Sequence, residues 1–435
     1  MNENVRCMSI VFLMLMCQVA SADDWPQWRG PGRDGVWKET GIIDSFEAAT
    51  IKRRWSVPIS SGYNGPTVAE GRVYVADRIT EPQEAERVHC FEWQTGKRLW
   101  SYSYECEYKI QFRAGPRASV TVHDGRAYAL GSMGHLHAFD AATGELLWKK
   151  DPMRDFKARV PVWGIAAAPL VEGDLLIVMI GGADDACVVA LDRRTGKRVW
   201  SALSDELVYS APVVIEQGGK RVLVCWTAKR LVGFNPTTGV IHWEHPYKFS
   251  RWVDGVVTPV RHGDRLFVSA FMDGALMLKL DDQLKVKQLW RRKGQNEKST
   301  AALHCLMSNP LMTDTHIYGV DAYGQFRCLA ADTGDRVWED TTVTTQTRWG
   351  TAHMVRHGDR TWIFNDIGEL IIARLAADGY HEISRAKLIE PTKVQLKRRN
   401  GVTWAHPAFA YKHVFARNDK ELICASLAAP DAAER

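Results

Sequence analysis

One phrase returns along the chain at a nearly fixed spacing: a small residue, an apolar residue, an acid or amide, two further residues, Thr-Gly, three residues and Trp. Three copies are complete and the others are looser. Successive copies lie 43 to 52 residues apart, and they end at Trp100, Trp148, Trp200, Trp243, Trp290 and Trp338. A repeat of this length predicts units that stack or form a ring, because no single unit can bury its own apolar faces.

Each unit has the same internal order. Residues 66–71 show an apolar run that ends in a Gly turn, and residues 72–76 show the β-branched and aromatic run that follows. A second turn then leads to the Thr-Gly hairpin and to the run that carries Trp. This order predicts four short strands in one antiparallel sheet. The Gly after Thr suits a left-handed turn position, and a Trp on the outer strand can wedge against the next sheet.

The number of units predicts the architecture. Six units end at the Trp residues, a seventh and degenerate unit covers residues 358–384, and an eighth covers residues 404–427 and is one strand short. A spare strand at residues 51–57 can supply the missing one. We therefore predict an all-β protein, an eight-bladed β-propeller of four-stranded antiparallel blades, closed by an N-terminal strand that pairs with the last sheet. The alternative is seven blades with a terminal strand pair outside the ring.

The chain divides into four segments. Residues 1–22 are typical of a secretory signal, with Arg6 at the positive end, an apolar run, and small residues at 20–22 before the expected cut. The apolar run is too short to span a membrane, so we expect an exported protein, periplasmic or secreted, with no transmembrane segment. The segments after the signal are a leader (23–50), the propeller (51–428) and a C-terminal tail (429–435).

Charge and cysteine content narrow the possible functions. The net charge is +5, with acids and bases interspersed and only short basic runs. Solvated surface charge is therefore favoured over nucleic-acid binding. Seven cysteines remain after residue 22, which is an odd number. Cys90 and Cys328 stand where other units carry Ala or Gly, which favours a small apolar role, and the spacing of the cysteines leaves any disulfide pairing open.

The repeated phrase resembles the docking motif of the pyrroloquinoline quinone (PQQ) repeat family, over roughly residues 50–428. The leader at residues 25–35 also resembles the opening of secreted bacterial PQQ-like repeat proteins. The family includes quinoprotein alcohol dehydrogenases and the non-catalytic outer-membrane assembly lipoprotein BamB. The resemblance therefore implies a propeller, and it leaves the choice between an enzyme and a scaffold to particular residues.

Few of the residues that the family's dehydrogenases use are found here. The resemblance implies a quinone at the ring centre, a disulfide of two adjacent cysteines, a Ca²⁺ ion held by Glu, Asn and Asp oxygens, and an Asp base. This sequence has no Cys-Cys pair and no Cys-x-x-Cys-His haem attachment. Asp254, with Asn64 and Asn309 as amide candidates, falls short of the six or more oxygens that Ca²⁺ takes. We expect no cofactor, and PQQ with Ca²⁺ is the alternative.

Residues that precede the innermost strands converge on one mouth of the ring's central channel, and aromatic side chains recur on seven of the eight approaches. This pattern predicts an aromatic and cationic funnel, in which rings stack on a ligand and Arg residues hold an anionic group. The alternative is that the rings only plug the channel. The candidate ligand-binding residues are Tyr63, Asn64, Arg113, Arg117, Trp163, Tyr209, Trp252, Asp254, Asn309, Arg348, Trp349, His353, Trp404 and His406.

Catalytic and metal sites find little support in the sequence. His353 and His406 are able to share a metal ion, but no third ligand is evident, so packing or hydrogen bonding is favoured for them. There is no Gly-x-Ser-x-Gly elbow, Walker loop or His-Glu-x-x-His motif. We assign no catalytic residue and no metal ligand.

Three functions are compatible with these observations. The first, which we favour, is an exported non-catalytic binding or scaffold protein, with a protein partner in the cell envelope or a small ligand at the propeller centre. The second is a PQQ-dependent oxidoreductase acting on alcohols or sugars. The third is a carbohydrate-binding propeller or lyase, although no suitably placed pair of carboxylates stands out.

Overall fold

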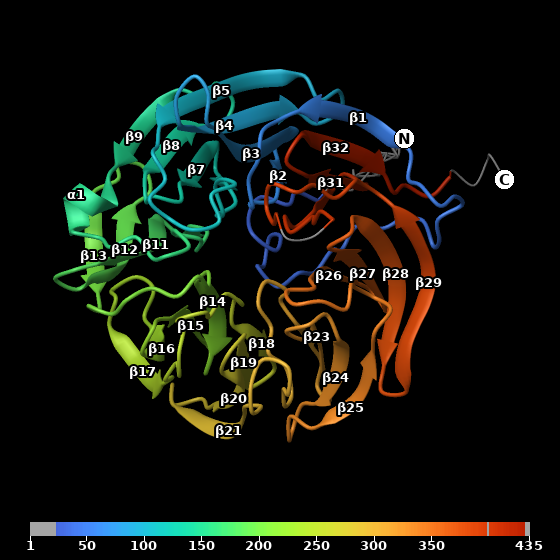
Figure 1. Cartoon of the computed structure of the whole chain (residues 1–435). Coiled ribbons are helices and arrows are strands. Elements are labelled where there is room, and N and C mark those ends of the chain that lie inside the picture. The colour runs from blue at the N-terminus through green and yellow to red at the C-terminus, as the bar shows by residue number, and fades with distance from the viewer. Residues whose placement is uncertain (1–22, 398–399, 431–435) are drawn as a thin grey trace, which may run out of the picture.

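The computed structural model describes residues 23–397 and 400–430. Within these residues, eight four-stranded antiparallel sheets form a ring, and one short helix, α1 (Pro152–Phe156), lies between the second and third sheets (Figure 1). This is the predicted eight-bladed β-propeller. The predicted signal at 1–22 and residues 431–435 of the tail lie outside the described residues. No helix in the described part of the chain is long and apolar enough to cross a membrane.

In seven blades the strands follow one another in chain order from the centre of the ring outward (Figure 1). The first four blades contain β2 (Thr67–Ala69), β3 (Arg72–Ile79), β4 (Ala85–Glu92) and β5 (Arg98–Glu105); β6 (Thr121–His123), β7 (Arg126–Leu130), β8 (Leu136–Asp140) and β9 (Leu146–Lys150); β10 (Leu170–Glu172), β11 (Leu175–Gly182), β12 (Ala186–Asp192) and β13 (Arg198–Ala202); and β14 (Val213–Gln217), β15 (Lys220–Trp226), β16 (Arg230–Phe234) and β17 (Ile241–Pro246). The next three contain β18 (Val260–His262), β19 (Arg265–Ala270), β20 (Gly274–Leu280) and β21 (Val286–Arg292); β22 (Leu311–Met312), β23 (His316–Val320), β24 (Phe326–Ala330) and β25 (Arg336–Asp340); and β26 (Ala352–His357), β27 (Arg360–Asn365), β28 (Glu369–Ala376) and β29 (Gly379–Lys387).

The eighth blade joins the two ends of the propeller. It contains β30 (Ala408–Ala410), β31 (His413–Arg417), β32 (Glu421–Ser426) and, as its outermost strand, β1 (Arg53–Pro58). Trp55 lies opposite Cys424 and Ser56 opposite Ile423 in this antiparallel pair. The predicted closure is confirmed, and seven blades with a strand pair outside the ring are excluded. The strand begins later than predicted because the Ile51 N–H donates instead to the Lys387 carbonyl of the seventh blade at 2.9 Å.

Trp residues of the outermost strands join neighbouring blades. Trp100 Nε1 donates to the Ala141 carbonyl of the next blade at 3.0 Å, and Trp200 Nε1 donates to the Pro236 carbonyl at 3.0 Å. In each case the acceptor lies in the turn that precedes Thr-Gly. The same contact is made by Trp148, Trp290 and the ring-closing Trp55. The predicted wedge against the next sheet is confirmed.

The Thr-Gly turn is shaped for this contact. Gly144 has φ +76°, and a Cβ on it would lie 2.5 Å from the Trp100 ring. Asp140 holds the turn, because its Oδ1 accepts from the Thr143 N–H at 2.8 Å and from the Thr143 hydroxyl at 2.9 Å. These bonds, chiefly the one from the N–H group, lower the pKa of Asp140. The repeated acid, Thr, Gly and Trp are thus parts of one joint between blades.

Trp243 meets a blade that lacks the Thr-Gly turn, and a glutamine bridges the gap. Trp243 Nε1 donates to Gln217 Oε1 at 2.9 Å. Gln217 Nε2 in turn donates to the carbonyls of Asp281 and Lys285, at 3.0 and 2.9 Å. The connection between the fourth and fifth blades therefore persists although the motif has been lost.

The seven cysteines of the described residues are all buried and unpaired. Cys90 and Cys328 pack in the apolar layers between blades, each beside the Trp of its own blade. Their predicted role as small apolar residues is confirmed, and no disulfide forms among the described residues.

Candidate functional site

Eight loops lead from the outermost strand of one blade to the innermost strand of the next, and we term them approach loops. Their described residues are 59–66, 106–120, 151–169, 203–212, 247–259, 293–310, 341–351, 388–397 and 400–407. Around the ring centre they enclose a cavity of about 710 Å³. Twelve of the fourteen predicted residues line it, and these are Tyr63, Arg113, Arg117, Trp163, Tyr209, Trp252, Asp254, Arg348, Trp349, His353, Trp404 and His406.

The aromatic wall is continuous, because neighbouring rings touch across blade boundaries. The ring centroids of Trp163 and Tyr209 lie 5.0 Å apart, and the ring planes are tilted by 31°. The ring centroid of Trp404 lies 6.4 Å from those of both Tyr63 and Trp349. Such a wall offers flat apolar faces to a ring or to a bulky side chain.

Asn64 and Asn309 are the two predicted residues that the structure places elsewhere, which corrects the expectation that they face the channel. Asn64 is fully buried, donates to the Ala76 carbonyl at 3.0 Å and accepts from Arg417 Nη1 at 3.2 Å. It therefore links the first blade to the eighth. Asn309 donates to the Thr258 carbonyl at 2.9 Å and borders a separate cavity of about 20 Å³. Some side chains of an approach loop point away from the channel and into the blade, and the spacing of residues in the sequence does not predict which ones do so.

The leader closes the channel behind the cavity, which sequence reasoning did not foresee. Its Trp28 lines the cavity, and Trp28 Nε1 donates to Thr258 Oγ1 of the fifth-blade approach loop at 2.8 Å. Its backbone is paired at Trp25 with Val68 of the first blade, where the N–H to carbonyl distance is 2.7 Å. The blue start of the chain is seen crossing the ring near its centre (Figure 1).

Arg33 fastens the leader to the ring. The Arg33 side chain is 3% exposed, and its guanidinium donates to the carbonyls of Ala168 at 3.2 Å, Pro212 at 3.0 Å and Pro169. Burial lowers the pKa of Arg33 to about 9. The only sequence signal for this role is the unusual composition of residues 25–35, WPQWRGPGRDG, and it does not indicate which blades the leader contacts.

The two histidines of the cavity are neutral hydrogen-bonding groups. His353 Nε2 donates to the Trp404 carbonyl at 2.8 Å, and burial lowers the pKa of His353 to about 4. His406 contacts Ser119 Oγ through Nε2 at 2.6 Å and the Pro407 carbonyl through Nδ1 at 3.1 Å, and burial lowers its pKa to about 3. No group of three or more His, Cys, Asp or Glu side chains suited to a metal occurs in the described part of the chain.

The cavity's arginines already have partners for most of their donors. Arg117 donates to the carbonyls of Gly115 and Gln111, at 2.6 and 2.9 Å, and lies over the Tyr63 ring. Arg113 pairs with Glu84 at 3.1 Å, and Arg348 pairs with Glu297. Arg117 nonetheless has no carboxylate within ion-pair distance among the described residues, so its charge contributes a positive potential to the cavity.

Asp254 is the one carboxyl group that lines the cavity. Its side chain is 1% exposed, and its Oδ2 accepts from the Met272 N–H at 3.0 Å. Its Oδ1 is buried without a hydrogen-bond partner among the described residues. Burial, with a smaller contribution from Asp273, raises the pKa of Asp254 to about 7. Burial therefore favours the protonated form of this carboxyl group.

These donors do not fit the PQQ and Ca²⁺ pair that the resemblance implies. Ca²⁺ takes six to eight oxygens, mostly from carboxylates and carbonyls. The cavity offers one carboxyl group, whose neutral form is favoured by burial, and Asn64 and Asn309 lie elsewhere. The described cysteines are unpaired, so none of them forms the disulfide against which a quinone would stack.

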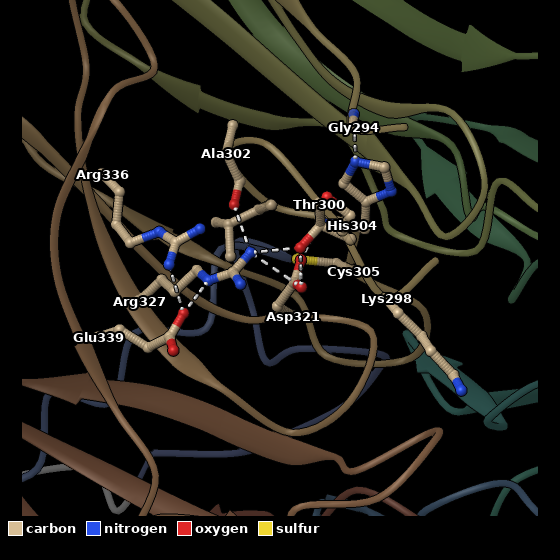
Figure 2. Close-up of polar contacts among 12 residues, drawn as sticks. Gly294, Lys298, Thr300, Ala302, His304, Cys305, Asp321, Arg327, Arg336 and Glu339 are labelled. Atoms are coloured by element: carbon tan, nitrogen blue, oxygen red, sulfur yellow. Dashed lines mark hydrogen bonds and ion pairs between the residues drawn. The ribbon is translucent and has the colours of Figure 1, made fainter. Parts of the chain in front are cut away.

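Buried acids fix the approach loops. In the sixth blade, Asp321 accepts from the His304 N–H at 2.6 Å and from Thr300 Oγ1 at 2.6 Å, and it pairs with Arg327 at 2.8 Å. Figure 2 shows these groups converging, with Glu339 on the far side of Arg327. The loop that they hold carries Leu306 and Met307 into the cavity wall.

The same device recurs in other blades. Each acid stands near the end of a second strand and accepts a backbone N–H from the approach loop: Asp77 from Ser60 at 2.6 Å, Asp273 from Ser250 at 3.0 Å, and Asp419 from Val394 at 3.1 Å. Fixing the loops in this way holds the cavity in shape before anything binds. The sequence signal for this role is an acid near the end of the second strand of a blade, and it is weaker than the Thr-Gly-Trp phrase.

Comparison with known proteins agrees with this architecture. A family model described as outer membrane protein assembly factor BamB matches residues 84–340, more than half of the chain. The quinohemoprotein alcohol dehydrogenase of Comamonas testosteroni is 28% identical over 193 residues, which are 42% of this chain and 26% of that enzyme. BamB of Shewanella oneidensis is 24% identical over 228 residues, which are 51% of this chain and 56% of BamB.

A solved structure supports the fold over nearly the full ring. BamB from Moraxella catarrhalis matches with a TM-score of 0.58 at 17% identity, over 87% of this chain and 98% of that one. Identity this low shows the fold alone. The chain spans about a quarter of the length of the curated dehydrogenases that it matches. The repeat phrase, the ring and the family match together show that the chain belongs to the PQQ-repeat propeller family whose model is described by BamB.

Proposed function

We propose that this protein is an exported, non-catalytic binding propeller that holds a partner at the open mouth of its central cavity. The observation that carries the proposal is the preformed aromatic cavity at the ring centre, whose wall contains one carboxyl group. The leader closes one end of the cavity, so a partner has access from the side of the approach loops. The similarity to BamB favours a protein as the partner, in the cell envelope.

Capture of partners from the native cell envelope tests this proposal. The mature protein, Trp252→Ala and Val199→Ala serve as baits, and bound proteins are identified by mass spectrometry. Trp252 lies at the mouth, whereas Val199 is an equally exposed apolar residue on the outer strand β13. We expect a reproducible partner that Val199→Ala retains and Trp252→Ala loses. Recovery of nothing above background, or equal recovery by both variants, would overturn the proposal.

Export is tested separately, because it depends on residues 1–22. Cell fractionation should find the full chain outside the cytoplasm and a chain lacking residues 1–22 inside it. Equal distribution of the two chains would contradict export.

The second candidate function is PQQ-dependent oxidation of alcohols or sugars, and the similarity to the Comamonas testosteroni dehydrogenase favours it. In that case Trp163, Trp252, Trp349 or Trp404 would stack on the quinone. Titration of the purified protein with PQQ and Ca²⁺, followed by dye reduction with alcohols and sugars, decides the matter. A quinone-dependent spectral change that Trp163→Ala abolishes, together with dye reduction, would replace the binding function by an enzymatic one.

A further inference from the structure

Exposed apolar side chains surround the mouth of the cavity. Val162, Trp252 and Val394 are 50%, 49% and 49% exposed, and they come from the approach loops of three different blades. Trp252 and Val394 also line the cavity. Most of the other exposed large apolar residues lie on outermost strands, away from the centre. An apolar rim that continues into a recessed aromatic wall is typical of a binding surface.

Positive charge is concentrated in the cavity wall, where Arg113, Arg117, Arg348 and Lys397 stand against the single carboxyl group of Asp254. The described residues of the eight approach loops include 13 Lys and Arg and eight Asp and Glu. The whole chain has an excess of only five basic residues. The described approach loops therefore carry a net positive charge, and the cavity wall itself contains more cations than carboxyl groups. A cavity of this kind attracts acidic partners and repels basic ones.

Most of the charged side chains of the approach loops that lack an ion pair among the described residues are cations, although the exposed acid Glu206 lacks one as well. Several acids of the approach loops are already paired, such as Glu297 with Arg348 and Asp205 with Arg230. By contrast, the exposed cations Lys248, Arg251 and Lys397 have no carboxylate within ion-pair distance among the described residues.

From this juxtaposition we infer that the partner enters the mouth as an acidic, extended protein segment that places a bulky apolar side chain in the central cavity. The inference rests on the proposed function and names the chemistry of its partner. The apolar anchor fills the aromatic cavity, while flanking Asp or Glu side chains meet the free cations of the rim. Binding would then combine one buried anchor with long-range electrostatic attraction.

Two other classes of partner fit the surface less well. A membrane surface is flat, and the apolar side chains that bury in it protrude, whereas the aromatic wall here is recessed. Single-stranded nucleic acid needs a positive groove that follows its backbone, whereas the free cations lie on separate loops around a ring. An acidic segment needs only to cross the mouth.

Selection from a displayed library of random dodecapeptides tests the inference. The mature protein is the target at low salt, and selected peptides are then measured by fluorescence anisotropy. The variants Trp252→Ala and Arg251→Glu/Lys248→Glu alter the mouth. Val199→Ala and Lys197→Glu are the matched controls, because both residues are exposed near or on the outer strand β13. All five substituted residues are solvent-exposed.

We expect selected peptides to be rich in Asp and Glu around one aromatic or large aliphatic residue. Their affinity should fall about tenfold or more in each mouth variant and should fall with rising salt, while both controls bind as the parent does. Selection of no peptide, or of neutral or basic peptides, would overturn the inference. So would tighter binding to anionic phospholipid vesicles or to poly-uridine RNA than to the peptides.

The same experiment separates the inference from the proposed function. If the selected peptides are neutral and do not bind the Trp252→Ala variant, the inference of an acidic partner is wrong but the mouth is still the binding site. Peptides that bind equally to Trp252→Ala would remove both.

Discussion

Trp28 of the leader and His406 of the eighth blade meet edge to face in the cavity, with ring centroids 4.5 Å apart. His406 is itself held through both ring nitrogens, so Trp28 packs against a fixed surface. The indole also reaches the fifth blade through its bond to Thr258. A segment outside the repeats thus determines where the cavity ends, and the leader belongs to the candidate site.

Removal of the Arg33 guanidinium should destabilise the protein strongly. In Arg33→Met the carbonyls of Ala168, Pro169 and Pro212 lose their buried donor, so the free energy of unfolding should fall by about 2–4 kcal/mol. Urea unfolding followed by tryptophan fluorescence measures the difference. Arg98→Met is the control, because Arg98 is exposed on β5. Equal unfolding midpoints for the two variants would show that the leader is not anchored through Arg33.

The joint between blades predicts a contrast between two glycines. Gly144→Ala places a methyl group 2.5 Å from the Trp100 ring, whereas a Cβ at Gly125 has nothing within 4 Å. Both residues have positive φ, so both substitutions carry the backbone strain of about 1–2 kcal/mol. Gly144→Ala should cost at least about 1 kcal/mol more, because the ring must also move. Equal midpoints of thermal unfolding for Gly144→Ala and Gly125→Ala would contradict the role of Gly144 in the contact between blades.

The ring and its closure were predictable because they rest on local, repeated signals. A Thr-Gly turn and a Trp strand identify a blade wherever they occur, and a blade lacking one strand needs a partner from the other end of the chain. The approach to each innermost strand likewise indicated twelve of the residues that line the cavity, out of fourteen candidates. Trp28 and Arg33 were missed because their contacts join segments more than a hundred residues apart.

The direction of single side chains was less predictable than their position. Asn64 stands beside Tyr63 in the same approach loop, yet Tyr63 lines the cavity while Asn64 turns back to Arg417. Arg117 was expected to hold an anion, but most of its N–H groups donate to backbone carbonyls of its own loop. The side chains turn toward backbone carbonyl groups that need a hydrogen-bond donor, and the positions of these carbonyls are known only from the folded structure.

The buried pair of Asp321 and Arg327 should show strong coupling. Arg327→Met leaves the Asp321 carboxylate buried without its cation, so the free energy of unfolding should fall by about 3–5 kcal/mol. Adding Asp321→Asn should recover part of that loss, because the uncompensated charge is then removed. A double-mutant cycle by urea unfolding measures the coupling. Strictly additive losses would mean that the two groups do not stabilise each other.

Asp254 should give the protein a distinct dependence of stability on pH. Its pKa is raised from 3.8 to about 7 in the folded protein, so between these values the folded chain keeps a proton that the unfolded chain releases. Stability contributed by the protonated carboxyl is therefore complete below about pH 4 and is lost as the pH rises through about 7. Asp254→Asn removes this titration while keeping an oxygen that accepts from the Met272 N–H.

Urea unfolding of the parent and of Asp254→Asn from pH 4.5 to 8 isolates the effect. The variant should gain on the parent as the pH rises, by at most about 4 kcal/mol over the full range, since each unit of pKa difference corresponds to about 1.4 kcal/mol. The pKa values of His353 and His406 are lowered, so these two residues make the folded protein more stable as the pH rises. Both proteins contain them, and their contribution therefore cancels in the difference. Asp282→Asn, at an exposed carboxyl, should run parallel to the parent. A constant gap between the parent and Asp254→Asn would show that the carboxyl ionises freely in the folded protein, and that it is not held in the protonated form by the cavity wall.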